Sequence, residues 1–198
     1  MRLIDSHLKN ADFVFEQSHV YLIEATSGAG KSSLCSFIVG HRKDYDGQIL
    51  FDARDIRTLS VDEWVKVRQT ELSLLYQDLR LFPELTAYEN VEIKNQLTQF
   101  KTRPQIEEWF DALGIADKMD AKIAFMSYGQ QQRVALMRAL VQPFQFLLAD
   151  EPTSHLDDEN SQIMGQILTE EARQQGAGVI VTSIGKHMDL PYETVYKL

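Results

Sequence analysis

Short apolar runs alternate along the chain with stretches in which apolar residues recur at helical spacing. Such short runs are typical of strands covered on both faces of a sheet. They lie at residues 19–25, 145–149 and 178–182, with more mixed candidates at 47–51 and 72–76. Helical spacing fills residues 31–39, 105–113, 130–141 and 158–174. This alternation predicts an α/β fold with a mostly parallel sheet.

One stretch departs from the alternation, because residues from about 78 to 141 are predicted to be almost entirely helical. We therefore expect a single domain over residues 1–198, with a helical subdomain inserted at about 78–141. The core would be formed by residues 1–77 and 142–198. Phe13 and Phe15 alternate in the N-terminal part and are expected in the core.

Composition narrows the class of protein. With 198 residues, 44% hydrophobic and 25% charged, the chain can bury a core without cross-links. Its single cysteine, Cys35, excludes an internal disulfide and a cysteine zinc site, and is expected to be a packed thiol. No apolar run approaches the roughly 18 residues of a membrane span. The net charge of −9 disfavours nucleic acid as a partner. We expect a soluble cytoplasmic domain.

Residues 25–33 (ATSGAGKSS) follow the first strong strand candidate and lead into a predicted helix. The glycines let backbone N–H groups turn toward phosphate oxygens, and the helix N-terminus adds a positive dipole. Lys31 would reach the β- and γ-phosphates, and the Ser32 hydroxyl would bind Mg²⁺. Ala25 stands where this motif has its first glycine. A plain glycine-rich turn with an exposed lysine is the alternative, which the flanking strand and helix disfavour.

A second candidate site follows the apolar run FLLA, where Asp150 and Glu151 end the predicted strand. Asp150 would lie beside the phosphate loop and hold Mg²⁺ through water, and Glu151 would polarise an attacking water. Alone, two acids after a strand are usually a solvated turn. Together with Lys31 and Ser32 they indicate hydrolysis of a nucleoside triphosphate.

The segments between these two sites carry a resemblance to a known family. Residues 126–133 (MSYGQQQR) resemble the LSGGQ signature of ATP-binding-cassette (ABC) ATPases, and residues 151–157 (EPTSHLD) resemble its D-loop stretch. Residues 75–78 (LYQD), followed by LFP and TAYENV, look like its Q-loop. The motifs run in family order from about Leu8 onward. Their wording is most similar to the lipoprotein-release, macrolide-efflux and cell-division exporters.

The resemblance implies a P-loop NTPase core with a small antiparallel N-terminal patch, and an enzyme that binds and hydrolyses ATP with Mg²⁺. The nucleotide would be held by Ser27, Gly28, Ala29, Gly30, Lys31, Ser32 and Ser33. From the opposing subunit it would be held by Ser127, Gly129 and Gln130. The implied metal ligands are Ser32, Gln77 and Asp150, and the implied catalytic residues are Glu151, Gln77 and Ser183. Asp157 would bridge the two sites of the dimer.

The same resemblance implies partners and location. The cassette would form a homodimer, or a heterodimer with another cassette, in the ATP state. It would power a separate membrane permease, met by residues 78–123, from the inner face of the membrane. Two alternatives stay open: a regulatory cassette that hydrolyses poorly, and a soluble ABC ATPase outside transport.

The chain departs from the family pattern at three places. Tyr128 occupies the position of the signature's first glycine, and Ser183 that of a histidine expected after the last apolar strand, for which His187 is a possible stand-in. We expect the strand with the usual adenine-stacking aromatic to be missing, with His7 as a possible substitute. We expect the Tyr128 ring to turn away and permit dimerisation. We also expect slow hydrolysis and weak base discrimination.

Overall fold

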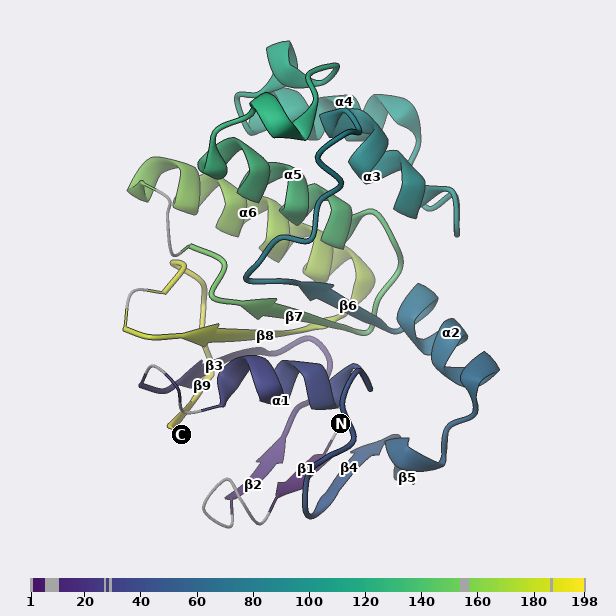
Figure 1. Cartoon of the computed structure of the whole chain (residues 1–198). Coiled ribbons are helices and arrows are strands. Elements are labelled where there is room, and N and C mark those ends of the chain that lie inside the picture. Colours follow the sequence, from purple (N-terminus) through teal and green to yellow (C-terminus); the bar gives the residue numbers. More distant parts are fainter. Residues whose placement is uncertain are drawn as a thin grey trace.

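The computed structural model describes residues 2–5, 11–26, 28, 30–153, 157–185 and 187–197. Among them, a five-stranded parallel sheet carries the predicted site (Figure 1). Its strands are, in spatial order, β6 (Leu72–Leu75), β7 (Phe146–Asp150), β8 (Gly178–Ser183), β3 (Val20–Glu24) and β9 (Thr194–Lys197). Every residue of β7 and β8 is buried, as continuous apolar runs require in a sheet covered on both faces.

A smaller antiparallel sheet packs beside the parallel one. Its order is β2 (Ala11–Val14), β1 (Arg2–Asp5), β4 (Gln48–Phe51) and β5 (Arg54–Asp55). Phe13 and Phe15 are buried in the core, as expected from their alternation. The α/β prediction with an antiparallel N-terminal patch is therefore confirmed. A strand before Leu8, expected to be missing, is present as β1, although it contains no aromatic residue.

Helices cover the two faces of the parallel sheet. Figure 1 shows α1 (Lys31–Ile38) on one side, and α5 (Tyr128–Leu140) with α6 (Asp158–Gln175) on the other. Neighbouring residues of β7 point to opposite faces, so Leu148 packs with α1 and Leu147 packs with α5 and α6. Cys35 on α1 is buried, as expected for a packed thiol.

After β6 the chain forms α3 (Ala87–Asn95) and α4 (Arg103–Ala112). In Figure 1 both lie on the side of α5 that faces away from the parallel sheet. Capping boxes set the first residues of α3, α4 and α5, through Thr86 with Glu89, Thr102 with Gln105, and Ser127 with Gln130. These caps explain why α4 and α5 begin two residues before the starts predicted from apolar spacing. Trp109 packs in this layer.

One helix lies outside the sequence-based prediction, α2 (Val61–Thr70), which buries little more than Trp64 and Val67. Its remaining apolar residues, Val61 and Val65, are exposed, which blurs the spacing that would have revealed it. Within the ranges given above, the structure contains no helix with the length and apolar character needed to cross a membrane.

Candidate nucleotide-binding site

The phosphate loop joins the carboxyl end of β3 to the first residue of α1. Gly28 has φ +79° and Gly30 has φ +97°, the left-handed region in which glycine carries no steric penalty. Gly30 also caps α1, so N–H groups at this helix start remain available to an anion. Ser27 and Ala29, the other predicted loop residues, lie outside the described residues.

The Lys31 side chain folds back over the phosphate loop. Its ammonium donates to the Ala25 carbonyl at 3.3 Å and the Thr26 carbonyl at 3.1 Å. It also pairs with Glu151 Oε1 at 3.5 Å, and the two side chains are only 4% and 11% exposed. The sequence predicted Lys31 and Glu151 in one site, and the structure brings them into contact.

The two acids diverge after β7. Asp150, buried at 5% exposure, accepts a hydrogen bond of 2.6 Å from the Thr182 hydroxyl of the neighbouring strand β8. Glu151 has φ +49°, and its N–H donates to the Thr182 carbonyl at 3.2 Å. The left-handed turn at Glu151 ends the strand, so that its carboxylate meets Lys31 while that of Asp150 meets Thr182.

Gln77 connects the loop with the acidic pair. Its Oε1 accepts from the Ser32 hydroxyl at 3.4 Å, and its Nε2 donates to Glu151 Oε2 at 3.1 Å. Ser32, Gln77 and Asp150 also line one cavity of about 260 Å³. A hydroxyl, an amide and a carboxylate are oxygen donors of the kind that Mg²⁺ prefers, so this set is chemically suited to that ion. Ser33 lies next on α1, where its hydroxyl accepts from Arg42.

The predicted signature residues gather at the first turn of α5. Ser127 caps the helix, where its hydroxyl accepts from the Gln130 N–H at 3.3 Å and its N–H donates to Gln130 Oε1 at 2.9 Å. Gly129 lies between them. Asp157, in the predicted D-loop, caps α6 through the N–H of Asn160.

Tyr128, which occupies the position of the signature's first glycine, binds back to its own chain. Its hydroxyl donates to the backbone carbonyl of Gln77 in the same chain at 3.1 Å, and its side chain stays 41% exposed. Burial and the nearby Asp78 raise the pKa of Tyr128, so its hydroxyl stays protonated at neutral pH. The ring is therefore held against its own chain by this bond.

Ser183 ends β8, where it is 2% exposed and pairs with Glu24 of β3. Its carbonyl accepts from the Ala25 N–H at 3.2 Å, which ties the strand end to the start of the phosphate loop. His187 is exposed, and its ring packs against Tyr192 with ring centres 5.3 Å apart. His7, the other proposed substitute, lies outside the described residues.

Thr182 is a site residue that the sequence did not reveal. It orients Asp150 through its hydroxyl and Glu151 through its carbonyl. A signal was available, since a threonine ends an apolar strand beside the strand that carries Asp150. Recognising it requires the strand order and the register, in which Asp150 faces Thr182.

A cationic groove adjoins the site, lined by residues of α2, β6, α3 and α5. Its cavity of about 440 Å³ is lined by apolar side chains, among them the exposed Phe82, Ile93 and Leu97. Its polar members are all basic or aromatic: His41, Arg68, Tyr76, Lys94 and Arg138. Burial and the neighbouring Arg138 lower the pKa of Lys94 to about 7. Burial, with Arg68 and Arg80, also lowers the pKa of His41.

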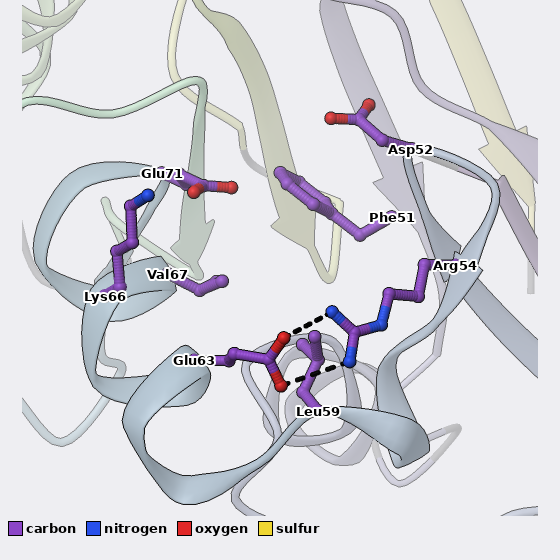
Figure 2. A pocket seen from close by; sticks show the side chains of 8 residues that line it. All are labelled: Phe51, Asp52, Arg54, Leu59, Glu63, Lys66, Val67 and Glu71. Carbon is purple, nitrogen blue, oxygen red and sulfur yellow. Dashed lines mark hydrogen bonds and ion pairs between the residues drawn. The ribbon is translucent and has the colours of Figure 1, made fainter.

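A different cavity, of about 280 Å³, lies near the first residue of β6 (Figure 2). It reaches Glu71, just before β6 begins, whereas the phosphate loop follows the end of β3. Arg54 donates to Glu63 across it, which lowers the pKa of Glu63 to about 2. Its lining includes none of the predicted site residues.

Comparison with known proteins finds relatives of this chain. The family profile described as "ABC transporter" matches residues 8–154. A macrolide export ATP-binding/permease protein MacB of Marinobacter nauticus is 33% identical over 88% of this chain, which spans 28% of that protein's length. A lipoprotein-releasing system ATP-binding protein LolD of Saccharophagus degradans is 31% identical over 96% of this chain and 85% of the relative.

Solved structures of ATP-binding cassettes are also similar to this chain. The dimeric ATP-binding cassette MJ0796 in a post-hydrolysis state, bound to ADP and Pi, superposes with a TM-score of 0.76. That comparison has 29% sequence identity and covers 89% of this chain and 79% of the other. A second dimeric structure of MJ0796 gives a TM-score of 0.78.

Proposed function

Because this chain belongs to the ABC transporter family, as a cassette that binds and hydrolyses ATP, we propose that it powers a separate membrane permease through ATP-driven dimerisation. The observation that carries the proposal is the contact network of Lys31, Gln77 and Glu151 at the carboxyl edge of the parallel sheet. This edge is where α/β sheets bind their ligands.

Each residue has a proposed part in the reaction. The phosphate loop, residues 27–33, binds the phosphates through N–H groups and through Lys31, whose ammonium moves from Glu151 to the β- and γ-phosphates. Ser32, Gln77 and Asp150 would hold Mg²⁺, which neutralises charge developing on the phosphate oxygens. Glu151 accepts a proton from the attacking water, and Gln77 orients that water.

Dimerisation completes the site in this proposal. Ser127, Gly129 and Gln130 of one subunit approach the γ-phosphate held by the other, and the start of α5 adds its N-terminal dipole. The dimeric state of MJ0796, bound to ADP and Pi, supports this arrangement by similarity. The partner cassette is a second copy of this chain or a related one.

The surface we propose for the permease is the cationic groove and the helical residues 78–123. Exposed Phe82, Ile93 and Leu97 offer an apolar floor for a permease helix, and Arg68 and Arg138 offer positive charge. The chain would then lie on the inner face of the membrane without crossing it. The net charge of −9 counts against a soluble role on nucleic acid.

A regulatory cassette that hydrolyses poorly is the second candidate, and Ser183 favours it. The short hydroxyl replaces the imidazole that the family resemblance leads one to expect near the γ-phosphate. Both candidates bind ATP and dimerise, so the rate of turnover and the presence of a permease distinguish them.

The test is a set of variants of the purified chain. We expect the wild type to hydrolyse ATP, Glu151→Gln to bind ATP and dimerise without turnover, and Lys31→Ala to lose ATP binding. Steady-state phosphate release, light scattering and nucleotide titration measure these outcomes. Hydrolysis by Glu151→Gln at the wild-type rate would refute the assigned role of Glu151. Purification from membranes without a co-purifying permease would refute the transport role.

A further inference from the structure

The loop that follows β6, residues 76–82, is held by side chains of α5 through its backbone carbonyls. We call it the Gln77 loop. From the first residue of α5, the Tyr128 hydroxyl donates to the Gln77 carbonyl at 3.1 Å. From near its end, Arg138 donates to the Leu79 carbonyl at 2.6 Å and the Arg80 carbonyl at 2.7 Å. Residues near both ends of α5 therefore hold the Gln77 loop.

The conformation that these contacts hold is strained. Leu79 has φ +57° and Arg80 has φ +50°, the left-handed region that costs a side-chain-bearing residue on the order of 1–3 kcal/mol. Such a conformation persists only where surrounding contacts determine it. The Arg80 guanidinium also lies over the Tyr76 ring, 4.2 Å from its centre. The loop and α5 therefore behave as one connected unit.

Gln77 extends this unit into the nucleotide site. Its backbone is bound by Tyr128, while its side chain bonds Ser32 and Glu151. Gln77 is thus the residue that joins the start of α5 to the side of the site proposed to hold the metal and water. Tyr128 makes this connection with a hydroxyl, which a glycine at that position does not have.

We propose that Tyr128 is a positioning residue, whose hydroxyl couples the start of α5 to the placement of Gln77 in the same subunit. The inference rests on the proposed function, in which Ser127 and Gly129 beside it engage the γ-phosphate held by the opposing subunit. Contact of one subunit with its partner's ATP thereby adjusts Gln77 in the first subunit's own site. The substitution at the signature glycine replaces close backbone approach with a link between the two sites.

The test separates this coupling from a purely structural or interfacial effect of the ring. It compares wild type, Tyr128→Phe, Gln77→Ala and the double variant. Tyr196→Phe is the matched control, because its hydroxyl also donates to a backbone carbonyl at 3.1 Å, that of Val14, away from the proposed site. Steady-state ATPase rates are measured against ATP and against Mg²⁺. Thermal unfolding identifies any loss of folding.

For Tyr128→Phe we expect kcat to fall by about three- to tenfold, the range of one hydrogen bond. The KM for ATP should stay within about twofold, because the phosphate loop is untouched, and half-saturation by Mg²⁺ should shift several-fold upward. In the Gln77→Ala background the same substitution should change kcat by less than about 1.5-fold, since coupled residues are not additive. Tyr196→Phe should match the wild type.

A second measurement does not depend on turnover. In the Glu151→Gln background with ATP, Tyr128→Phe should weaken binding of Mn²⁺, used as a spectroscopic substitute for Mg²⁺, by several-fold in electron paramagnetic resonance titrations. Equal Mn²⁺ affinity, an unchanged kcat, or equal effects with and without the Gln77 side chain would each overturn the proposal. A wild type that neither hydrolyses ATP nor dimerises with it would instead overturn the proposed function.

Discussion

Thr182 offers a direct test of how the buried acid is held. Its hydroxyl donates to Asp150 Oδ1 at 2.6 Å, and its side chain is fully buried. Thr182→Val keeps the shape of the side chain and removes the donor. The Glu151 N–H loses its contact with the Thr182 hydroxyl at 3.3 Å but keeps the Thr182 carbonyl at 3.2 Å. The perturbation therefore falls chiefly on Asp150.

The magnitude follows from the charge of the acceptor. A hydrogen bond to an ionised group contributes about 1.5–3 kcal/mol, so Thr182→Val should lower the free energy of unfolding by about that amount. Thr182→Ser keeps the donor and loses one buried methyl, which costs about 0.5–1.5 kcal/mol by comparison with Ile→Val. The two variants thus separate the loss of the bond from the loss of packing.

Chemical denaturation at pH 7 measures the stabilities, and titration of ATPase activity with Mg²⁺ measures the effect on the proposed metal site. Loss of a residue that orients a metal ligand typically costs 10- to 100-fold in metal affinity, so Thr182→Val should need at least about tenfold more Mg²⁺. Thr182→Ser should stay close to wild type. Equal Mg²⁺ requirements in the two variants, or wild-type stability in Thr182→Val, would refute this reasoning.

Three further predictions concern charge and nucleotide handling. With the pKa of Lys94 lowered from 10.5 to about 7, the unfolded chain binds more protons between these values, and stability rises with pH across that window. In denaturant titrations, Lys94→Met should therefore raise the free energy of unfolding most below pH 7, and this gain over the wild type should disappear toward pH 10. β1 contains no aromatic residue that could stack on the base. Without such a stack, worth about 1–3 kcal/mol, ATP and GTP should bind with similar affinity in competition titrations; a strong preference for ATP contradicts this. Ser183→His should raise kcat, because such donors contribute roughly 10²–10³ in rate, and an unchanged rate contradicts the role of Ser183.

The parts of the fold that local sequence determines were predicted well. β7 and β8 are continuous apolar runs, and the phosphate loop has its glycines where positive φ occurs. Ser127 and Gln130 have the spacing of a capping box, so the start of α5 could also have been predicted from the sequence. Ser60 and Glu63 give the start of α2 the same signal, although two of its apolar residues face solvent and blur the helical spacing.

Contacts between distant segments were beyond the sequence. The bond from Thr182 to Asp150 depends on strand register, and the bond from Tyr128 to Gln77 depends on how α5 lies over the loop after β6. The family resemblance identified Tyr128 as a departure from the signature's first glycine. It did not fix the direction of the ring, which we expected to turn away and permit dimerisation. In the structure the Tyr128 hydroxyl is bound to the Gln77 carbonyl of its own chain. That the ring permits dimerisation stays a prediction.

The contact between Lys31 and Glu151 makes the proposed chemistry depend on the arrival of nucleotide. Both side chains are almost fully buried, so neither charge can be left without a partner at low cost. In the proposed mechanism, phosphate oxygens would give the Lys31 ammonium a new partner, while the Gln77 amide already holds the other oxygen of Glu151. Glu151 would then be released to bind water. Because Glu151 is paired with Lys31 in the absence of ATP, we expect water to be activated only after the phosphates are in place.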